Sequence, residues 1–332
     1  TFTVTFPENR KFDESAHARL IANHFGTNHT EIEGSILTPD LLESLAMQYD
    51  EPMIDSSMLP TYMVSNLVKK YCTVALGGDG GDELFGGYGH YSRLLWMAEK
   101  LGPIPKMIRE GISMFAKTLP IGFKGRIWLQ NLGENFDSDL PLIATLFEDK
   151  FRESLMTKNF NWDIVAEQKR KARIPNASSL LQRATRMDFY NYLPEDILVK
   201  VDRASMLNSL ELRSPFLDHR IIDYAFSSVP DNLKCTSSQR KIILKNIAKD
   251  ILPSQFDFER KQGFGVPLGK WIRGGEWKTF FGDILLYGND SLFNKKTVEK
   301  IYKSHMNGND NTERLFSLVM LELWRKKYKV SF

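Results

Sequence analysis

Strand-like and helix-like patterns alternate along the N-terminal part of the chain. Residues 1–6 alternate threonine with phenylalanine or valine, which predicts a strand. Apolar side chains then recur at helical spacing from Ala18 to Phe25, so we expect an amphipathic helix there. Asp13 is placed to cap this helix and Gly26 to end it. The elements expected next are a strand over 28–32, helices from Pro39 and from Pro60, and a short buried strand over 72–76.

This alternation indicates an α/β fold, in which a parallel sheet carries helices on its faces. From residue 178 onward the pattern is helical, and the last helix has an apolar face with Phe316, Val319 and Met320. Between residues 102 and 176, prolines break the pattern into pieces that predict several short helices. Ligands of such sheets bind at the carboxyl ends of the strands, so the segment after residue 76 is the first candidate site.

That segment, GGDGGDELFGGYGHY, combines glycines with acids. The glycines at 77, 78, 80 and 81 let a ligand approach the backbone, whose N–H groups can converge on an anion. Asp79, Asp82 and Glu83 offer the hard oxygen atoms that a divalent cation prefers. The loop therefore predicts a site for a metal-bound polyphosphate.

Four other interpretations of this loop are weaker. Gly77 to Asp82 fits one copy of a calcium-binding nonapeptide, but that fold needs stacked copies. A dinucleotide fingerprint would meet Glu83 in place of its last glycine, and no lysine follows at the spacing of a phosphate-binding P-loop. A plain structural turn stays open, although it explains poorly why four glycines and three acids crowd one strand end.

Composition describes an ordinary globular protein of 332 residues, with 42% hydrophobic residues and a net charge of +3. So small a charge gives no reason to expect nucleic acid or an anionic membrane as the main partner. The basic run over 169–173 has no interleaved aromatic residue, which favours a solvated helix face. Cys72 and Cys235 are too few for a disulfide framework, and no apolar run reaches membrane-spanning length, so we expect a cytoplasmic location.

Six segments carry a family resemblance in one order along the chain. They are FDESAHARLIANHFGTNHTEI, IDSSMLPTYMVSNLV, GGDGGDELFGGYGHY, KVDRASMLNSLELRSPFLDHRIIDYA, RKQGFGVPLGKWIRGGEW and RLFSLVMLELW. Together they resemble the C-terminal synthetase domain of the glutamine-dependent asparagine synthetases. The match is faint only over residues 95–180.

The resemblance implies an ATP-pyrophosphatase-type (adenine-nucleotide α-hydrolase-like) fold and a ligase that forms carbon–nitrogen bonds. Aspartate would be activated as β-aspartyl-AMP with release of pyrophosphate, and ammonia would then give asparagine and AMP. The cofactors implied are ATP and Mg²⁺, and the ammonia would come from a glutaminase domain; a homodimer is left open. The expected parts of the synthetase domain are a nucleotide-binding α/β part over 1–95, a variable helical region over 96–180, and a helical part over 181–332 that completes the active site.

The resemblance also carries roles to single residues. Asp82 matches a magnesium ligand, where the metal would offset charge on the leaving pyrophosphate. Asp79 matches an acidic position at the acyl-transfer site. Lys261 matches a lysine that stabilises negative charge as the adenylate forms and breaks. Tyr88 and Asp202 match a tyrosine–acid pair of the related β-lactam-forming synthetases.

Three further positions match the nucleotide pocket. Val4 and Gly78 match backbone positions that hold the nucleotide, and Gly77 stands where some members have serine. A backbone contact constrains the side chain weakly, so these positions depend on the resemblance alone.

Each proposed catalytic side chain also has a structural alternative. Without the resemblance, Tyr88 would be a half-buried aromatic residue, Lys261 a surface charge, and Asp202 an ion partner of Arg203. A separate group, Glu211, Arg213 and Asp218, is expected in a buried turn with paired charges and is left out of the catalytic set.

The chain departs from the family pattern near its start. The family's pyrophosphate loop, Ser-Gly-Gly-x-Asp-Ser, belongs to the strand before the one at residues 1–6, and no such motif occurs in this sequence. We therefore expect a domain without its first strand, pyrophosphate loop and glutaminase domain, which binds ATP poorly and shows no glutamine-dependent turnover. Two alternatives stay open: amidation of another carboxylate, such as a sugar acid or a lactam precursor, and a non-catalytic remnant of the fold.

Overall fold

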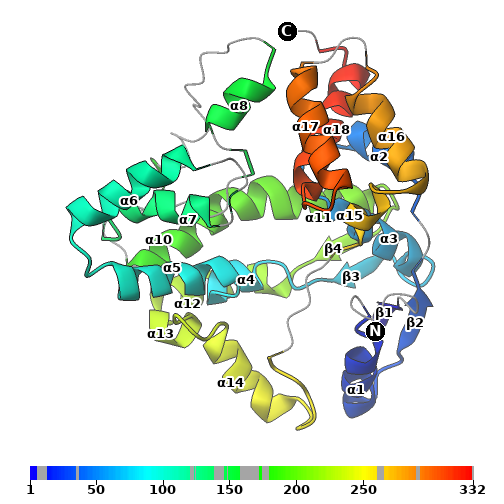
Figure 1. Cartoon of the computed structure of the whole chain (residues 1–332). Coiled ribbons are helices and arrows are strands. Elements are labelled where there is room, and N and C mark those ends of the chain that lie inside the picture. Colours follow the sequence, from blue (N-terminus) through cyan, green and yellow to red (C-terminus); the bar gives the residue numbers. More distant parts are fainter. Residues whose placement is uncertain are drawn as a thin grey trace.

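The computed structural model has a helix-rich α/β architecture with short strands (Figure 1). It describes residues 1–5, 13–34, 37–119, 123, 125–137, 146–147, 149–157, 172–173, 179–259, 265–288 and 292–330. The strands in these ranges are β1 (Phe2–Thr5), β2 (Thr30–Glu33), β3 (Val74–Leu76) and β4 (Glu211–Arg213).

Helices make up most of the described chain. Those before residue 180 are α1 (Ser15–Phe25), α2 (Leu41–Gln48), α3 (Met58–Val68), α4 (Gly81–Phe85), α5 (Gly89–Leu101), α6 (Lys106–Thr118), α7 (Arg126–Gln130), η1 (Asn131–Gly133) and α8 (Asp149–Leu155). Those after it are α10 (Leu180–Met187), the π-helix η2 (Asp188–Ile197), α11 (Leu198–Met206), η3 (Pro215–Leu217), α12 (His219–Ser227), α13 (Asp231–Lys234), α14 (Ile242–Ile251), α15 (Leu268–Trp271), α16 (Gly275–Leu285), α17 (Lys295–Met306) and α18 (Thr312–Lys327). None of the described helices is both long and apolar enough to span a bilayer.

The strands form two separate parallel pairs, β1 with β2 and β3 with β4. Phe2 lies opposite Thr30 in the first pair, and Val74 lies opposite Glu211 in the second. Parallel strands need a long crossover, which here always includes helices. The prediction of parallel strands with flanking helices is confirmed, although the described strands do not join into one sheet.

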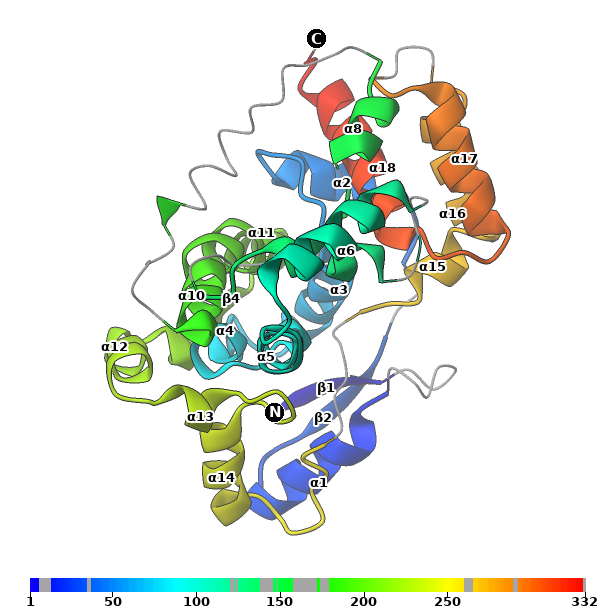
Figure 2. The ribbon, with the colours of Figure 1, turned by 60° about the vertical axis from the view of Figure 1, so that its left-hand side comes forward.

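The first pair also reaches the C-terminal half of the chain. Helix α1 packs beside β1 and β2, and α14 lies next to it (Figure 2). At that contact His24 Nε2 lies 3.0 Å from the carbonyl oxygen of Ile251, the last residue of α14.

Strand β4 corrects the sequence interpretation of its region. The expected buried turn over Glu211, Arg213 and Asp218 is wrong: Glu211 and Arg213 are exposed in a strand, with Arg213 Nε donating to Glu211 Oε1 at 2.7 Å. Only Leu212 between them is half-buried, so the period-two pattern spans three residues and is too short to stand out in a helical region. Asp218 caps α12 by accepting the backbone N–H of Arg220 at 2.9 Å.

Strand β3 is more exposed than its apolar sequence predicts. Val74 is 41% exposed and Leu76 is 73% exposed, so the prediction of a buried strand is wrong for these residues. The physical reason is that, within the described chain, β3 pairs with β4 alone and its other edge has no strand beside it. The ring centroids of Phe2 in β1 and Tyr71, just before β3, are 5.3 Å apart, so the two pairs lie near each other.

The predicted helix ends and the predicted core helix are confirmed. Asp13 Oδ1 accepts the first N–H of α1 at 3.0 Å, and Gly26 ends that helix with a left-handed φ of 61°. In α18, the side chains of Phe316, Val319 and Met320 are fully buried in the largest apolar cluster. This cluster joins α2 and α3 to α16, α17 and α18.

A buried ion pair on α18 gives a stability prediction. Glu322 and Arg325 have side chains only 2% and 7% exposed, and their charged atoms are 2.9 Å apart. Glu322→Ala leaves the buried guanidinium without its carboxylate, so the free energy of unfolding should fall by about 3–5 kcal/mol in urea titrations. As a control, Glu299→Ala breaks the exposed pair with Lys303 and should cost less than about 1 kcal/mol. Equal losses would contradict the prediction.

Candidate active site

The glycine-acid loop lies at the carboxyl ends of β3 and β4, where the fold class predicts a site. The N–H of Gly77 donates to the carbonyl oxygen of Arg213 at 2.8 Å, and Ser214 Oγ donates to the carbonyl oxygen of Asp79. Gly80 takes a left-handed φ of 87° just before α4, and a Cβ there would overlap Leu217. These contacts fix the loop to the chain after β4.

Asp79 is a half-buried carboxyl on this loop. Burial raises its pKa, while the ammonium of Lys200 acts in the opposite direction. A Cβ on Gly77 would lie 3.1 Å from Asp79 Oδ2, so a side chain there would crowd the carboxyl group. Gly78 is exposed, with no atom within 4 Å of a Cβ position, which leaves room for a ligand against the backbone.

Asp82 lies in the first turn of α4 and pairs with a lysine that sequence reasoning missed. Its Oδ1 is 2.9 Å from Nζ of Lys241, and about a third of each side chain is exposed. Lys241 has a left-handed φ of 53° at the start of α14, an uncommon conformation for a side chain with a Cβ. Neither that backbone angle nor the long-range pairing has a signal in the sequence.

The residues at this site fit a magnesium ion that takes its other ligands from phosphate oxygens and water. No cluster of three or more possible metal-binding side chains occurs in the described ranges, so Asp82 would supply one oxygen. Magnesium is commonly held by one or two carboxylates together with phosphate oxygens and water. A site with one accessible carboxylate beside open glycine backbone matches that requirement.

Tyr88 contacts an acid other than the one expected. Its hydroxyl donates to Glu83 Oε1 at 2.6 Å, and Glu83 is fully buried. Burial raises the pKa of both groups, and their contact raises that of Tyr88 further while lowering that of Glu83. Asp202, in contrast, has a 69% exposed side chain 3.9 Å from Nε of Arg203. The structure therefore brings Tyr88 to Glu83 and leaves Asp202 at the surface.

The remaining expected residues lie elsewhere. Val4 is half-buried in β1, opposite Ile32, and so belongs to the other strand pair. Lys261 lies outside the described residues.

A second group of charged side chains is linked to Asp79, and within itself, by electrostatic interactions. Lys200 Nζ lies 2.7 Å from Asp55 Oδ2, and only 8% of the lysine side chain is exposed. Asp196, in η2, is nearby; its Oδ1 is buried without a hydrogen-bond partner, and burial raises its pKa to about 7. We call Asp55, Asp79, Asp196 and Lys200 the Lys200 cluster. No local sequence pattern indicates this cluster, because its members come from four separate segments.

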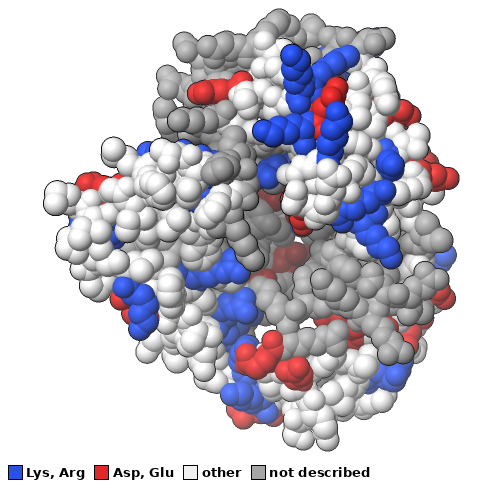
Figure 3. Space-filling view, in the orientation of Figure 1, with Lys and Arg blue, Asp and Glu red and all other residues white. Residues whose placement is uncertain are grey.

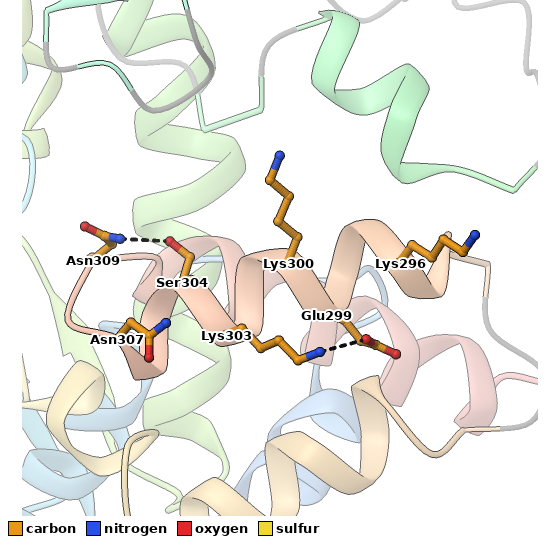
Figure 4. A pocket seen from close by; sticks show the side chains of 7 residues that line it. All are labelled: Lys296, Glu299, Lys300, Lys303, Ser304, Asn307 and Asn309. Atoms are coloured by element: carbon orange, nitrogen blue, oxygen red, sulfur yellow. Dashed lines mark hydrogen bonds and ion pairs between the residues drawn. The ribbon is translucent and has the colours of Figure 1, made fainter.

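A cavity of about 500 Å³ lies on α17 (Figure 4). Lysines 296, 300 and 303 line it and stand apart from one another, with Lys303 paired to Glu299 at 3.1 Å. The space-filling view shows such lysines gathered over α17, and acidic side chains in the recess across the middle of that face (Figure 3). The lining of the α17 cavity thus has a single acid, Glu299, and no glycine, unlike the loop.

Comparisons with known proteins match nearly the whole chain. A family model described as asparagine synthase matches residues 1–326. The chain is 29% identical over 332 residues to glutamine-hydrolysing asparagine synthetase 1 of Bacillus subtilis (strain 168), covering 98% of this chain and 51% of that protein. A putative glutamine-hydrolysing asparagine synthetase of Mycobacterium bovis is 29% identical over 98% of this chain and 50% of its own length. Amidase chyE of Penicillium rubens is 24% identical over 82% of this chain and 44% of that protein. The chain thus spans about half the length of the curated relatives it matches.

Proposed function

Because the chain belongs to the asparagine synthase family, we propose that it is the ATP-dependent amidating part of a glutamine-hydrolysing asparagine synthetase, a carbon–nitrogen ligase. The side-chain carboxylate of aspartate would attack the α-phosphorus of ATP, and pyrophosphate would leave. Ammonia would then attack the acyl carbon, giving asparagine and AMP. The names of the two synthetase relatives support this reaction.

The observation that carries the proposal is the loop between β3 and α4. It presents Asp79 and Asp82 at one sheet edge. Asp82 lies 2.9 Å from Nζ of Lys241, and the positive charge of Lys200 acts to lower the pKa of Asp79 against the effect of burial. Alternating acids and ammonium groups suit a reaction that brings a carboxylate, a metal and a polyphosphate together.

Each side chain would have a distinct part in this chemistry. Bound magnesium would offset negative charge on the phosphates, and Asp82 would supply one of its ligands. Lys241, beside Asp82, would place a further positive charge near the same phosphates. Glu83 would hold the hydroxyl of Tyr88 toward the acyl-transfer side. Lys261 would keep the role that the family resemblance implies, whereas Glu83 would take the place beside Tyr88 that was expected for Asp202.

We also propose that the ATP-pyrophosphatase-type sheet is continuous in the working enzyme. Within the described residues, β1 and β3 each pair along one edge only. This arrangement and the exposed Val74 and Leu76 suit a further strand between the two pairs. A strand that carries the Ser-Gly-Gly-x-Asp-Ser loop would complete both the sheet and the pyrophosphate site.

The test is a substrate panel with the protein in the full length that its gene encodes. Pyrophosphate and AMP would be measured with ATP, magnesium and ammonia, using aspartate, uronic acids and β-amino acids as separate acceptors. We expect release of both products with aspartate, and asparagine in equal amount. Release of pyrophosphate and AMP with another acceptor, and none with aspartate, would identify that acceptor as the substrate. No release with any acceptor would favour a non-catalytic remnant.

A further inference from the structure

We infer that Asp188 is a positioning residue, which holds Tyr88 in place for acyl transfer through two neighbouring rings. These rings are the imidazole of His90 and the phenol of Tyr91. The inference rests on the proposed function, because that function places Tyr88 on the acyl-transfer side. Asp188 itself need not touch the substrate.

The first step of the argument is that the backbone around Tyr88 does not fix its ring. Tyr88 lies between Gly87 and Gly89, just before α5, and glycine has the widest range of backbone angles. The hydroxyl of Tyr88 donates to Glu83 Oε1 at 2.6 Å, which holds one end of the side chain. The orientation of the ring about that contact must therefore come from its neighbours in space.

The second step is that three other rings contact the ring of Tyr88. The imidazole of His90 stacks on it, with centroids 5.3 Å apart and an angle of 20° between the planes. The ring centroids of Tyr91 and Tyr192 lie 5.7 and 5.9 Å away, one tilted and one edge-on. Stacked and edge-on contacts between aromatic rings prefer defined geometries, so these neighbours set the orientation of Tyr88.

The third step is that Asp188 holds two of these rings at one oxygen atom. Its Oδ2 accepts the hydroxyl of Tyr91 at 2.6 Å and lies 2.9 Å from Nε2 of His90. Because a carboxylate can only accept hydrogen bonds, Nε2 donates, and this bond orients the imidazole. Tyr91 is fully buried, and its burial and the nearby carboxylate raise its pKa, so it keeps the proton that it donates.

The fourth step is the position of Asp188 in the fold. Asp188 is the first residue of η2, and Tyr192 follows four residues later, so one helix supplies both the third ring and the carboxylate that holds the other two. π-Helical turns are rare and often lie at functional sites. Packing alone explains the carboxylate poorly, because its side chain is only 15% exposed and an apolar residue would fill the place without the cost of burying a charge.

The experiment measures the two half-reactions separately in the full-length protein with Asp188→Ala, which removes the acceptor of both rings. Exchange of labelled pyrophosphate into ATP in the presence of aspartate reports formation of the adenylate, and asparagine made from ammonia reports acyl transfer. A displacement of about 1 Å can cost about a hundredfold in rate. Since Glu83 still holds the hydroxyl, we expect asparagine formation to fall by about tenfold while the exchange is unchanged. Asp188→Asn keeps an oxygen acceptor and should restore most of the rate. Equal losses in both half-reactions, or no loss in either, overturn the inference.

His90→Ala tests the same link at a more exposed position. The His90 side chain is 35% exposed, so the fold should tolerate its loss, and again only asparagine formation should fall. His219→Ala is the matched control, because His219 also lies beside an aspartate, Asp218, at 3.8 Å, but its side chain is 84% exposed. The control should change neither half-reaction. A His90→Ala enzyme as active as the control would contradict the inference.

The Tyr88→Phe background separates a positioning role from a purely structural one. If Asp188 acts through the hydroxyl of Tyr88, then Asp188→Ala should cost little more once that hydroxyl is gone, since residues that act as a unit are not additive. A purely structural role would give the same further loss as in the wild type, and that result would overturn the inference.

A last readout does not need activity. Fluorine NMR of the protein with 3-fluorotyrosine, with Tyr88 assigned from Tyr88→Phe, reports the surroundings of its ring. The Tyr88 signal should move in Asp188→Ala, because the stacked imidazole loses its anchor, and an unchanged signal overturns the inference. Absence of pyrophosphate exchange and of asparagine in the wild type would instead overturn the proposed function, and the fluorine signal would still decide whether Asp188 holds Tyr88.

Discussion

Asp82→Asn should lower ATP-dependent pyrophosphate formation by about a hundredfold to a thousandfold, the usual cost of removing one electrostatic stabiliser from an active site. The amide keeps the shape of the side chain but loses the charge that would hold magnesium. The fold should survive, because Asp82 is a third exposed and its contact with Lys241 reaches the surface. The measurement is the initial rate of pyrophosphate release at saturating ATP and magnesium.

The control for this variant is Asp218→Asn. Asp218 is also a carboxylate beside a cation, Arg220, and asparagine caps a helix as well as aspartate does. Its activity should match that of the wild type. If Asp82→Asn were as active as this control, Asp82 would have no part in catalysis.

Gly87→Ala should lower activity nearly as much as Asp82→Asn, but by disturbing packing instead of removing a charge. A Cβ at this position would overlap both Asp82 Oδ1 and Cε of Lys241, so both side chains must leave their places. We expect a loss of activity of about a hundredfold, comparable to removal of an active-site group. The loss should appear in kcat/KM at every pH.

Gly111→Ala is the matched control. Gly111 lies within α6, and a Cβ there meets no atom within 4 Å. Alanine in a helix interior should raise stability by up to about 1 kcal/mol and leave activity unchanged. A fully active Gly87→Ala enzyme would show that the Asp82–Lys241 contact does not matter for the reaction.

Sequence patterns predicted the helices with long apolar faces and the position of the loop. Helix α18 and the end of α1 at Gly26 could be predicted because each depends on a local repeat or a single left-handed residue. Strand β4 could not, because it has three residues and its partner β3 lies far away in sequence. Strand order depends on such long-range pairing, which local patterns do not contain.

In the candidate site, too, features within one segment could be predicted and contacts between distant segments could not. The resemblance located Asp79, Asp82 and Tyr88 on one loop, and the structure keeps them there. The partner of Asp82 could not be predicted, since Lys241 approaches the loop only after folding. Glu83 was visible next to Asp82 in the sequence, but its contact with Tyr88 depends on the short helix α4, which contains Glu83 and ends at Phe85.

The ammonium beside Asp82 has a consequence for the order in which ligands arrive. A divalent cation that approaches this carboxylate alone must compete with an internal counterion already 2.9 Å away. A cation that arrives chelated to a nucleotide brings phosphate oxygens that can accept the displaced ammonium, so the same competition costs little. Titration with magnesium alone should therefore give weak binding, and magnesium and nucleotide should load as one complex.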